Sequence, residues 1–144
     1  MAVSVPLTGG CAYECAAEPL FMWKCHCREC QRSTGGGSAV NVVFSASSVR
    51  FTKGAPKEHV STGTSGNQTY RGFCPECGSP ISARADLISA IRGISAASLD
   101  DPSQLELVAD IWTASAQPWD ELSATLPQFA TTPTEAELQE LASH

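Results

Sequence analysis

The sequence predicts a mainly β fold, with one domain of short antiparallel strands and a short C-terminal helix. Between residues 20 and 112, short runs rich in Val, Ile, Phe and Thr alternate with Gly, Pro and Asp turn signals. Such frequent turns favour antiparallel strands over βαβ units. A length of 144 residues suggests one domain with one modest core. We assign residues 7–130 to this β domain and residues 131–144 to a tail.

The expected elements follow the order of the chain. Strands are predicted at residues 20–24, 39–44, 48–52, 57–61, 69–73, 80–85, 87–94 and 105–112. Residues 28–34 should form a helical turn that stops at the glycines 35–37. In the tail, Thr132 is a capping residue, Pro133 takes the first helical position and Glu135 the third. The tail should therefore be helical, with Leu138 and Leu141 on one face.

The composition excludes several classes of partner. A formal net charge of −6 argues against nucleic acid, because phosphate binding needs a basic surface. The N-terminus lacks the basic and apolar segments of a signal peptide, and no apolar run is long enough to cross a membrane. We therefore expect a cytoplasmic protein without a membrane partner. In that compartment clustered cysteines indicate metal or redox chemistry more often than disulfides.

Three of the seven cysteines lie within six residues, at Cys25, Cys27 and Cys30. Three thiolates on one short loop suit zinc, which prefers four ligands, and they leave one position unfilled. The site is either an open catalytic zinc or a structural knuckle that borrows a fourth ligand. His26 is the nearest candidate for closing it, although a residue between two ligands usually points away from their metal.

The other four cysteines suggest a second, closed zinc site. Cys74 and Cys77 form a C-x-x-C knuckle, and Cys11 and Cys15 can supply the remaining two ligands. The knuckle could instead be a redox pair. Up to two zinc ions per chain are thus expected, one in a closed four-thiolate site and one in an open three-thiolate site.

With these motifs in place, the chain resembles the glutathione-dependent formaldehyde-activating family, whose wider group includes centromere protein V. The matching segments are residues 9–11, 25–35, 53–54, 65–66, 71–78 and 117–120. The resemblance implies a tent-like, zinc-ribbon-like β fold on one structural zinc, with a second zinc open to a thiol substrate. It also implies a carbon–sulfur lyase activity in which glutathione, the candidate co-substrate, and formaldehyde or a related small aldehyde combine reversibly.

The chain departs from the family pattern at two places. About five residues are missing after Cys11, including the second structural cysteine of the usual G-G-C-x-C-G opening. Either Cys15 replaces that ligand, or it stays on a strand behind the site and only Cys11, Cys74 and Cys77 converge. The second departure is Ser38, which stands where relatives often carry an aromatic residue.

The open site suggests a mechanism in which Cys25, Cys27 and Cys30 are the catalytic ligands. Zinc deprotonates a thiol that binds as its fourth ligand, and the thiolate attacks an aldehyde carbonyl. Arg28, Arg32 and Arg71 are candidates to offset negative charge or to hold substrate carboxylates. His26 is expected to face solvent.

Two rival functions are a non-catalytic zinc module that scaffolds a partner, and a thiol–disulfide or sulfoxide reductase, which would need a cysteine outside the metal sites.

Overall fold

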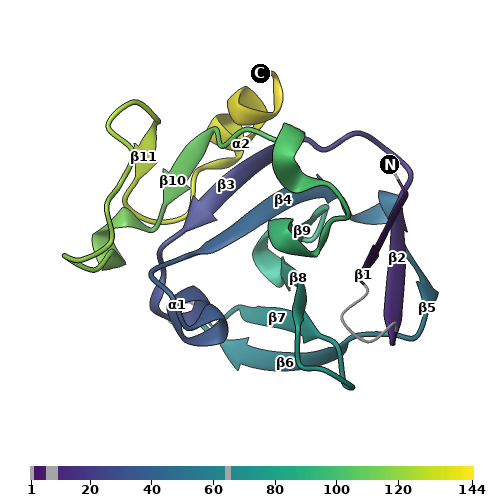
Figure 1. Cartoon of the computed structure of the whole chain (residues 1–144). Coiled ribbons are helices and arrows are strands. Elements are labelled where there is room, and N and C mark those ends of the chain that lie inside the picture. Colours follow the sequence, from purple (N-terminus) through teal and green to yellow (C-terminus); the bar gives the residue numbers. More distant parts are fainter. Residues whose placement is uncertain (1, 6–9, 64–65) are drawn as a thin grey trace.

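The computed structural model describes residues 2–5, 10–63 and 66–144 and shows a mainly β protein with two sheets and two short α-helices (Figure 1). The smaller sheet has the strand order β1-β2-β5. It contains β1 (Ala2–Val5), β2 (Cys11–Cys15) and β5 (Val49–Lys53). The larger sheet has the order β11-β10-β3-β4-β9-β8-β7-β6. The mainly β fold predicted from the sequence is thus confirmed.

The larger sheet carries the elements around the cysteine loop. Its strands are β3 (Phe21–Cys25), β4 (Ala39–Ser45), β6 (Lys57–Thr62), β7 (Gln68–Phe73), β8 (Pro80–Ala85), β9 (Ile91–Ser95), β10 (Ala109–Ile111) and β11 (Gln128–Phe129). The helix α1 (Arg28–Thr34) connects β3 to β4 and ends at Gly35, whose φ of 77° is the left-handed conformation that favours glycine. The helix predicted over these residues is confirmed.

The direction of two strand pairs and the boundaries of several strands differ from the prediction. The pairs β3–β10 and β10–β11 are parallel, whereas the other strand pairs of the described chain are antiparallel. The apolar run 87–94 yields a strand only from Ile91, and the run 105–112 yields a strand only over Ala109–Ile111. Short 3-10 turns break up or connect the strands: η1 (Ala46–Ser48), η2 (Asp86–Ile88), η3 (Ala96–Ser98), η4 (Pro102–Gln104) and η5 (Thr113–Ser115).

The C-terminal helix α2 (Glu135–Ala142) begins two residues later than the sequence suggested. Its N-cap is Thr134, whose backbone N–H donates to Glu137 Oε2 at 2.7 Å, while Thr134 Oγ1 accepts from the Glu137 N–H at 3.3 Å. Thr132 is engaged elsewhere, because its Oγ1 accepts from Trp112 Nε1 at 3.1 Å. The capping box therefore begins at Thr134, two residues after the residue that was predicted to cap the helix.

Strand β4 is buried on both faces and separates two apolar clusters. Val42 and Phe44 face a cluster that includes Tyr13 of β2, so this core lies between the two sheets. Val43 faces the opposite cluster, which contains Cys25, Cys30 and Leu141 of α2. The cysteine loop is thus fixed on one side by an apolar core. Within the described residues, no helix has the length and apolar character needed to cross a membrane.

Candidate metal centre

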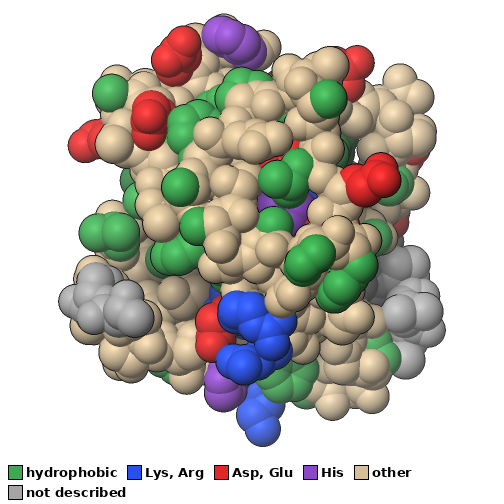
Figure 2. Space-filling model, turned by 90° about the vertical axis from the view of Figure 1, so that its left-hand side faces the viewer, with side chains coloured by type: hydrophobic (Ala, Val, Ile, Leu, Met, Phe, Trp, Pro, Cys, Tyr) green, Lys and Arg blue, Asp and Glu red, His purple; other side chains and the backbone are tan. Residues whose placement is uncertain are grey.

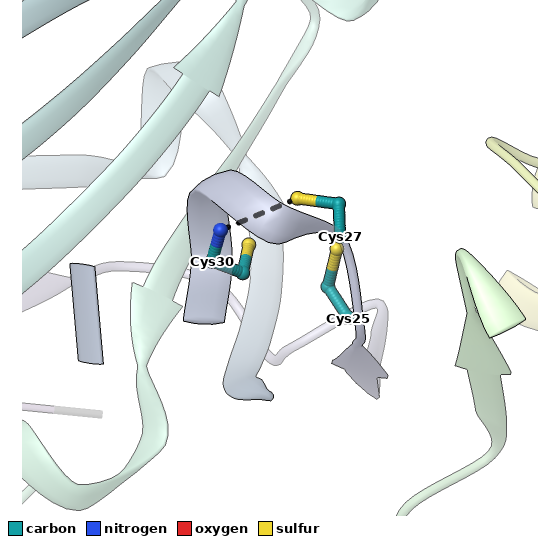
Figure 3. Close-up of side chains that lie close together, drawn as sticks. All are labelled: Cys25, Cys27 and Cys30. Atoms are coloured by element: carbon teal, nitrogen blue, oxygen red, sulfur yellow. Dashed lines mark hydrogen bonds between the residues drawn. The ribbon is translucent and has the colours of Figure 1, made fainter. Parts of the chain in front are cut away.

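The structure brings Cys25, Cys27 and Cys30 together where β3 meets α1. Cys25 is the last residue of β3, Cys27 is the N-cap of α1, and Cys30 lies in its first turn. The three Sγ atoms lie within 4.8 Å of one another and point toward a common volume (Figure 3). Tetrahedral zinc with bonds of about 2.3 Å separates its sulfur ligands by about 3.8 Å, so a small closure of this cluster fits the ion.

The cluster has three donors within the described residues. In the described part of the chain, no further Cys, His, Asp or Glu side chain joins this group. The N-cap geometry helps to set the spacing, because the Cys30 backbone N–H donates to Cys27 Sγ at 3.3 Å. Three thiolates with one vacant coordination position are the donor set of a site that can accept an external ligand.

The guanidinium group of Arg71, on β7, lies beside the thiols of the cluster. Arg71 of β7 places its NH2 group 3.7 Å from Cys30 Sγ and 3.9 Å from Cys27 Sγ. Hydrogen bonds from Cys25 and Cys30 lower the pKa of Cys27 well below its ordinary value, and the charge of Arg71 contributes. Hydrogen bonds with Cys27 and Cys30, together with burial, raise the pKa of Cys25. The cluster therefore favours a negative charge at Cys27 even before a metal ion binds.

The expectation that His26 faces solvent is wrong, because its side chain is 0% exposed. Its Nε2 lies 2.8 Å from Asp110 Oδ1, and its Nδ1 lies 3.0 Å from Asp120 Oδ2. The backbone N–H of His26 also donates to the Ile111 carbonyl at 2.9 Å. His26 thus points away from the metal position and anchors the cysteine loop to the C-terminal third of the chain.

A second buried side chain, Gln31, completes this anchoring. Its Nε2 donates to the His26 carbonyl at 2.7 Å and to the Ser115 carbonyl at 3.0 Å. Its Oε1 accepts from Gln117 Nε2 at 3.0 Å and from Arg28 NH1. Sequence reasoning missed this network. One available signal was Asp110, an acidic residue within an apolar run, since a buried carboxylate requires partners.

A cleft of about 490 Å³ opens beside Cys30. Its polar lining includes Cys30, Arg32, Asn41, His59, Arg71 and Ser82. Of the three arginines predicted as substrate contacts, Arg32 and Arg71 therefore line the cleft, whereas Arg28 is exposed and directed to Gln31. His59, to which the sequence assigned no role, pairs with Arg71 across β6 and β7. Figure 2 shows Lys and Arg side chains gathered in one patch on this face, with an acidic and a His side chain beside it.

The second group of cysteines is only partly assembled. Cys11 forms a hydrogen bond with Cys74. Burial raises the pKa of the Cys11 thiol most, Cys74 raises it next, and the charge of the nearby Cys77 adds a smaller increase. Cys15 is buried at the other end of β2, four residues from Cys11 along an extended strand, or roughly 13 Å away. The structure therefore places Cys15 away from this group, and of the described residues only Cys25, Cys27 and Cys30 form a set of three donors close enough to share a metal ion.

Fold and site together define a small β protein with a three-cysteine cluster that could hold a metal ion. Residues 7–115 match the family described as glutathione-dependent formaldehyde-activating enzyme, and the chain belongs to that family. No curated protein matches the chain. A crystal structure of a Rhodobacter sphaeroides protein, a structural genomics target, is similar with a TM-score of 0.55 and 17% identity, over 90% of this chain and 99% of that one. At this identity the likeness concerns the fold alone.

Proposed function

We propose that the protein is a zinc-dependent enzyme of carbon–sulfur bond chemistry, which forms and cleaves the adduct of a small thiol and an aldehyde. The observation that carries the proposal is the set of three converging thiols at the edge of a cleft, which no fourth donor joins among the described residues. Membership of the formaldehyde-activating family supports glutathione and formaldehyde, or a related small aldehyde, as the substrates.

Cys25, Cys27 and Cys30 would hold the zinc ion. The ion would supply a position at which a substrate thiol loses its proton at neutral pH. Three thiolates give such a centre a formal charge of −1, and the guanidinium of Arg71 at 3.7 Å from Cys30 Sγ offsets part of it. In the forward reaction the thiolate sulfur attacks the carbonyl carbon, a carbon–sulfur bond forms, and the carbonyl oxygen takes up a proton.

The cleft explains how a charged thiol such as glutathione would be oriented. Arg71 is mostly buried, with a side chain 17% exposed, and its NH1 lies 3.7 Å from Glu29 Oε2. A substrate carboxylate can replace or share this long contact, because guanidinium groups pair well with carboxylates. Arg32 and His59 add positive or neutral donors to the same lining. The cleft thus combines an anion-binding side with the metal position.

The rival reductase function receives no support from the cysteine that lies outside both groups. Cys15 is 1% exposed, and burial raises its pKa, so its thiolate is disfavoured and it is a poor nucleophile.

The scaffold function is distinguished from the enzyme by experiment. Exchange NMR of glutathione with formaldehyde should show faster adduct formation with the zinc-loaded protein than with Cys30→Ser. Equal rates for the two proteins would argue for a non-catalytic module.

A further inference from the structure

The cleft beside Cys30 adjoins a second cavity of about 500 Å³. Four residues line both cavities and so mark the junction between them: Thr34, Ala39, Pro80 and Ser95. Ala39 is also the register partner of Cys25 across β3 and β4. The junction therefore lies next to the metal position.

The two cavities differ in chemistry because β4 presents different residues to them. Asn41 lines the cleft with the arginines, whereas Val40, on the opposite face of the strand, lines the second cavity. The apolar lining of the second cavity consists of Ala39, Val40, Pro80, Ala96, Ala97 and Leu99. Ala96 and Leu99 are buried, and the hydroxyl of Ser98 is engaged with Tyr13 at 2.7 Å and the Ser95 carbonyl at 2.7 Å. Six of the eleven lining residues are thus apolar, and that side of the cavity suits an alkyl group, whereas Asp100 and the serines form its polar side.

We infer that the substrate adduct carries an alkyl chain, which lies in the second cavity while the thiol part lies in the cleft. This inference rests on the proposed function. Formaldehyde contributes a single carbon and would leave the second cavity unused. An aldehyde of several carbons places its chain through the junction, where burial of each methylene strengthens binding by about threefold to fourfold. The substrate class is therefore the adduct of a carboxylate-bearing thiol with a medium-chain aliphatic aldehyde.

Calorimetry with two stable thioethers, S-methylglutathione and S-hexylglutathione, tests the inference on the zinc-loaded protein. The hexyl compound should bind at least about tenfold more tightly, because its five additional methylenes occupy the apolar cavity. Ala97→Phe should remove this preference, since Ala97 is exposed on η3 and lines only the second cavity. Ala90→Phe adds the same ring to an exposed alanine outside both cavities and should keep the preference.

Equal affinity for the two thioethers, or a preference that survives Ala97→Phe, would overturn the inference. The rate of adduct formation with formaldehyde and with hexanal separates this result from a failure of the proposed function. Conversion of formaldehyde without any alkyl preference keeps the reaction and removes the alkyl site. Alkyl-selective binding that Ala97→Phe abolishes, without conversion of either aldehyde, keeps the site and removes the reaction.

Discussion

His26 Nε2 lies 2.8 Å from Asp110 Oδ1 in a region closed to solvent, and this contact joins the cysteine loop to β10. Asp120 approaches the other ring nitrogen at 3.0 Å. Both ring nitrogens of the buried imidazole therefore have a carboxylate partner. Because His26 lies between the proposed ligands Cys25 and Cys27, its two contacts fix the backbone that carries both sulfurs.

Replacement of His26 by Asn should weaken metal binding about tenfold or more, because outer partners of metal ligands contribute on this scale. Competition with a chelator measures the affinity, and the thiolate absorption of the cobalt-substituted protein reports the ligand geometry. His144→Asn, at the exposed C-terminal residue, is the matched control. If His26→Asn does not fold, Asp120→Asn provides the milder test, since Asp120 is partly exposed at 19%. An unaltered spectrum in both variants would show that this contact does not position the ligands.

Arg71→Met should reduce the affinity for glutathione while leaving zinc content unchanged. Methionine keeps part of the apolar stem but removes the charge that lies 3.7 Å from Cys30 Sγ. We expect a loss of about 2 kcal/mol, within the range for charge-assisted hydrogen bonds, measured by calorimetry. Arg50→Met is the control, because the Arg50 side chain is 70% exposed and pairs only with Glu14 in the described structure. Equal glutathione affinity in the two variants would remove Arg71 from the substrate site.

Cys15→Ala should keep the zinc content of the native protein. Cys15 lies at the far end of β2 from Cys11, within the apolar cluster between the sheets. Loss of its sulfur should therefore cost only the packing of a small side chain, about 1 kcal/mol in the free energy of unfolding. Elemental analysis and thermal melting measure the two quantities. Loss of one zinc ion together with a large drop in Tm would instead make Cys15 a structural ligand.

Much of the fold and part of the site could be predicted from the sequence, for identifiable physical reasons. Short β-rich runs with Gly and Pro turns mark strands locally, and the spacing of Cys25, Cys27 and Cys30 on one loop already limits their separation. The role of His26 depends on Asp110 and Asp120, which lie 84 and 94 residues away in the sequence. Such long-range partners leave little local signal, so burial of His26 could not be read from its neighbours.

The second cysteine group shows the same limit. Spacing alone permits Cys11 and Cys15 to share a metal ion, because three intervening residues can form a loop. The pairing of β2 with β1 and β5 instead holds these residues extended, so that Cys11 and Cys15 face the same core cluster from opposite ends of the strand. Strand pairing is a tertiary property that the local sequence does not show, and it places Cys15 away from the other cysteines of this group.

Titration of the cobalt-substituted protein with glutathione tests whether Cys25, Cys27 and Cys30 form an open metal centre. We predict that glutathione changes the thiolate-to-metal absorption, that the change saturates, and that Cys30→Ser abolishes it. Cys77→Ser, which alters the other cysteine group, should retain it. A spectrum that stays unchanged at high glutathione, in a protein that holds cobalt at these three cysteines, would contradict an open site for this thiol.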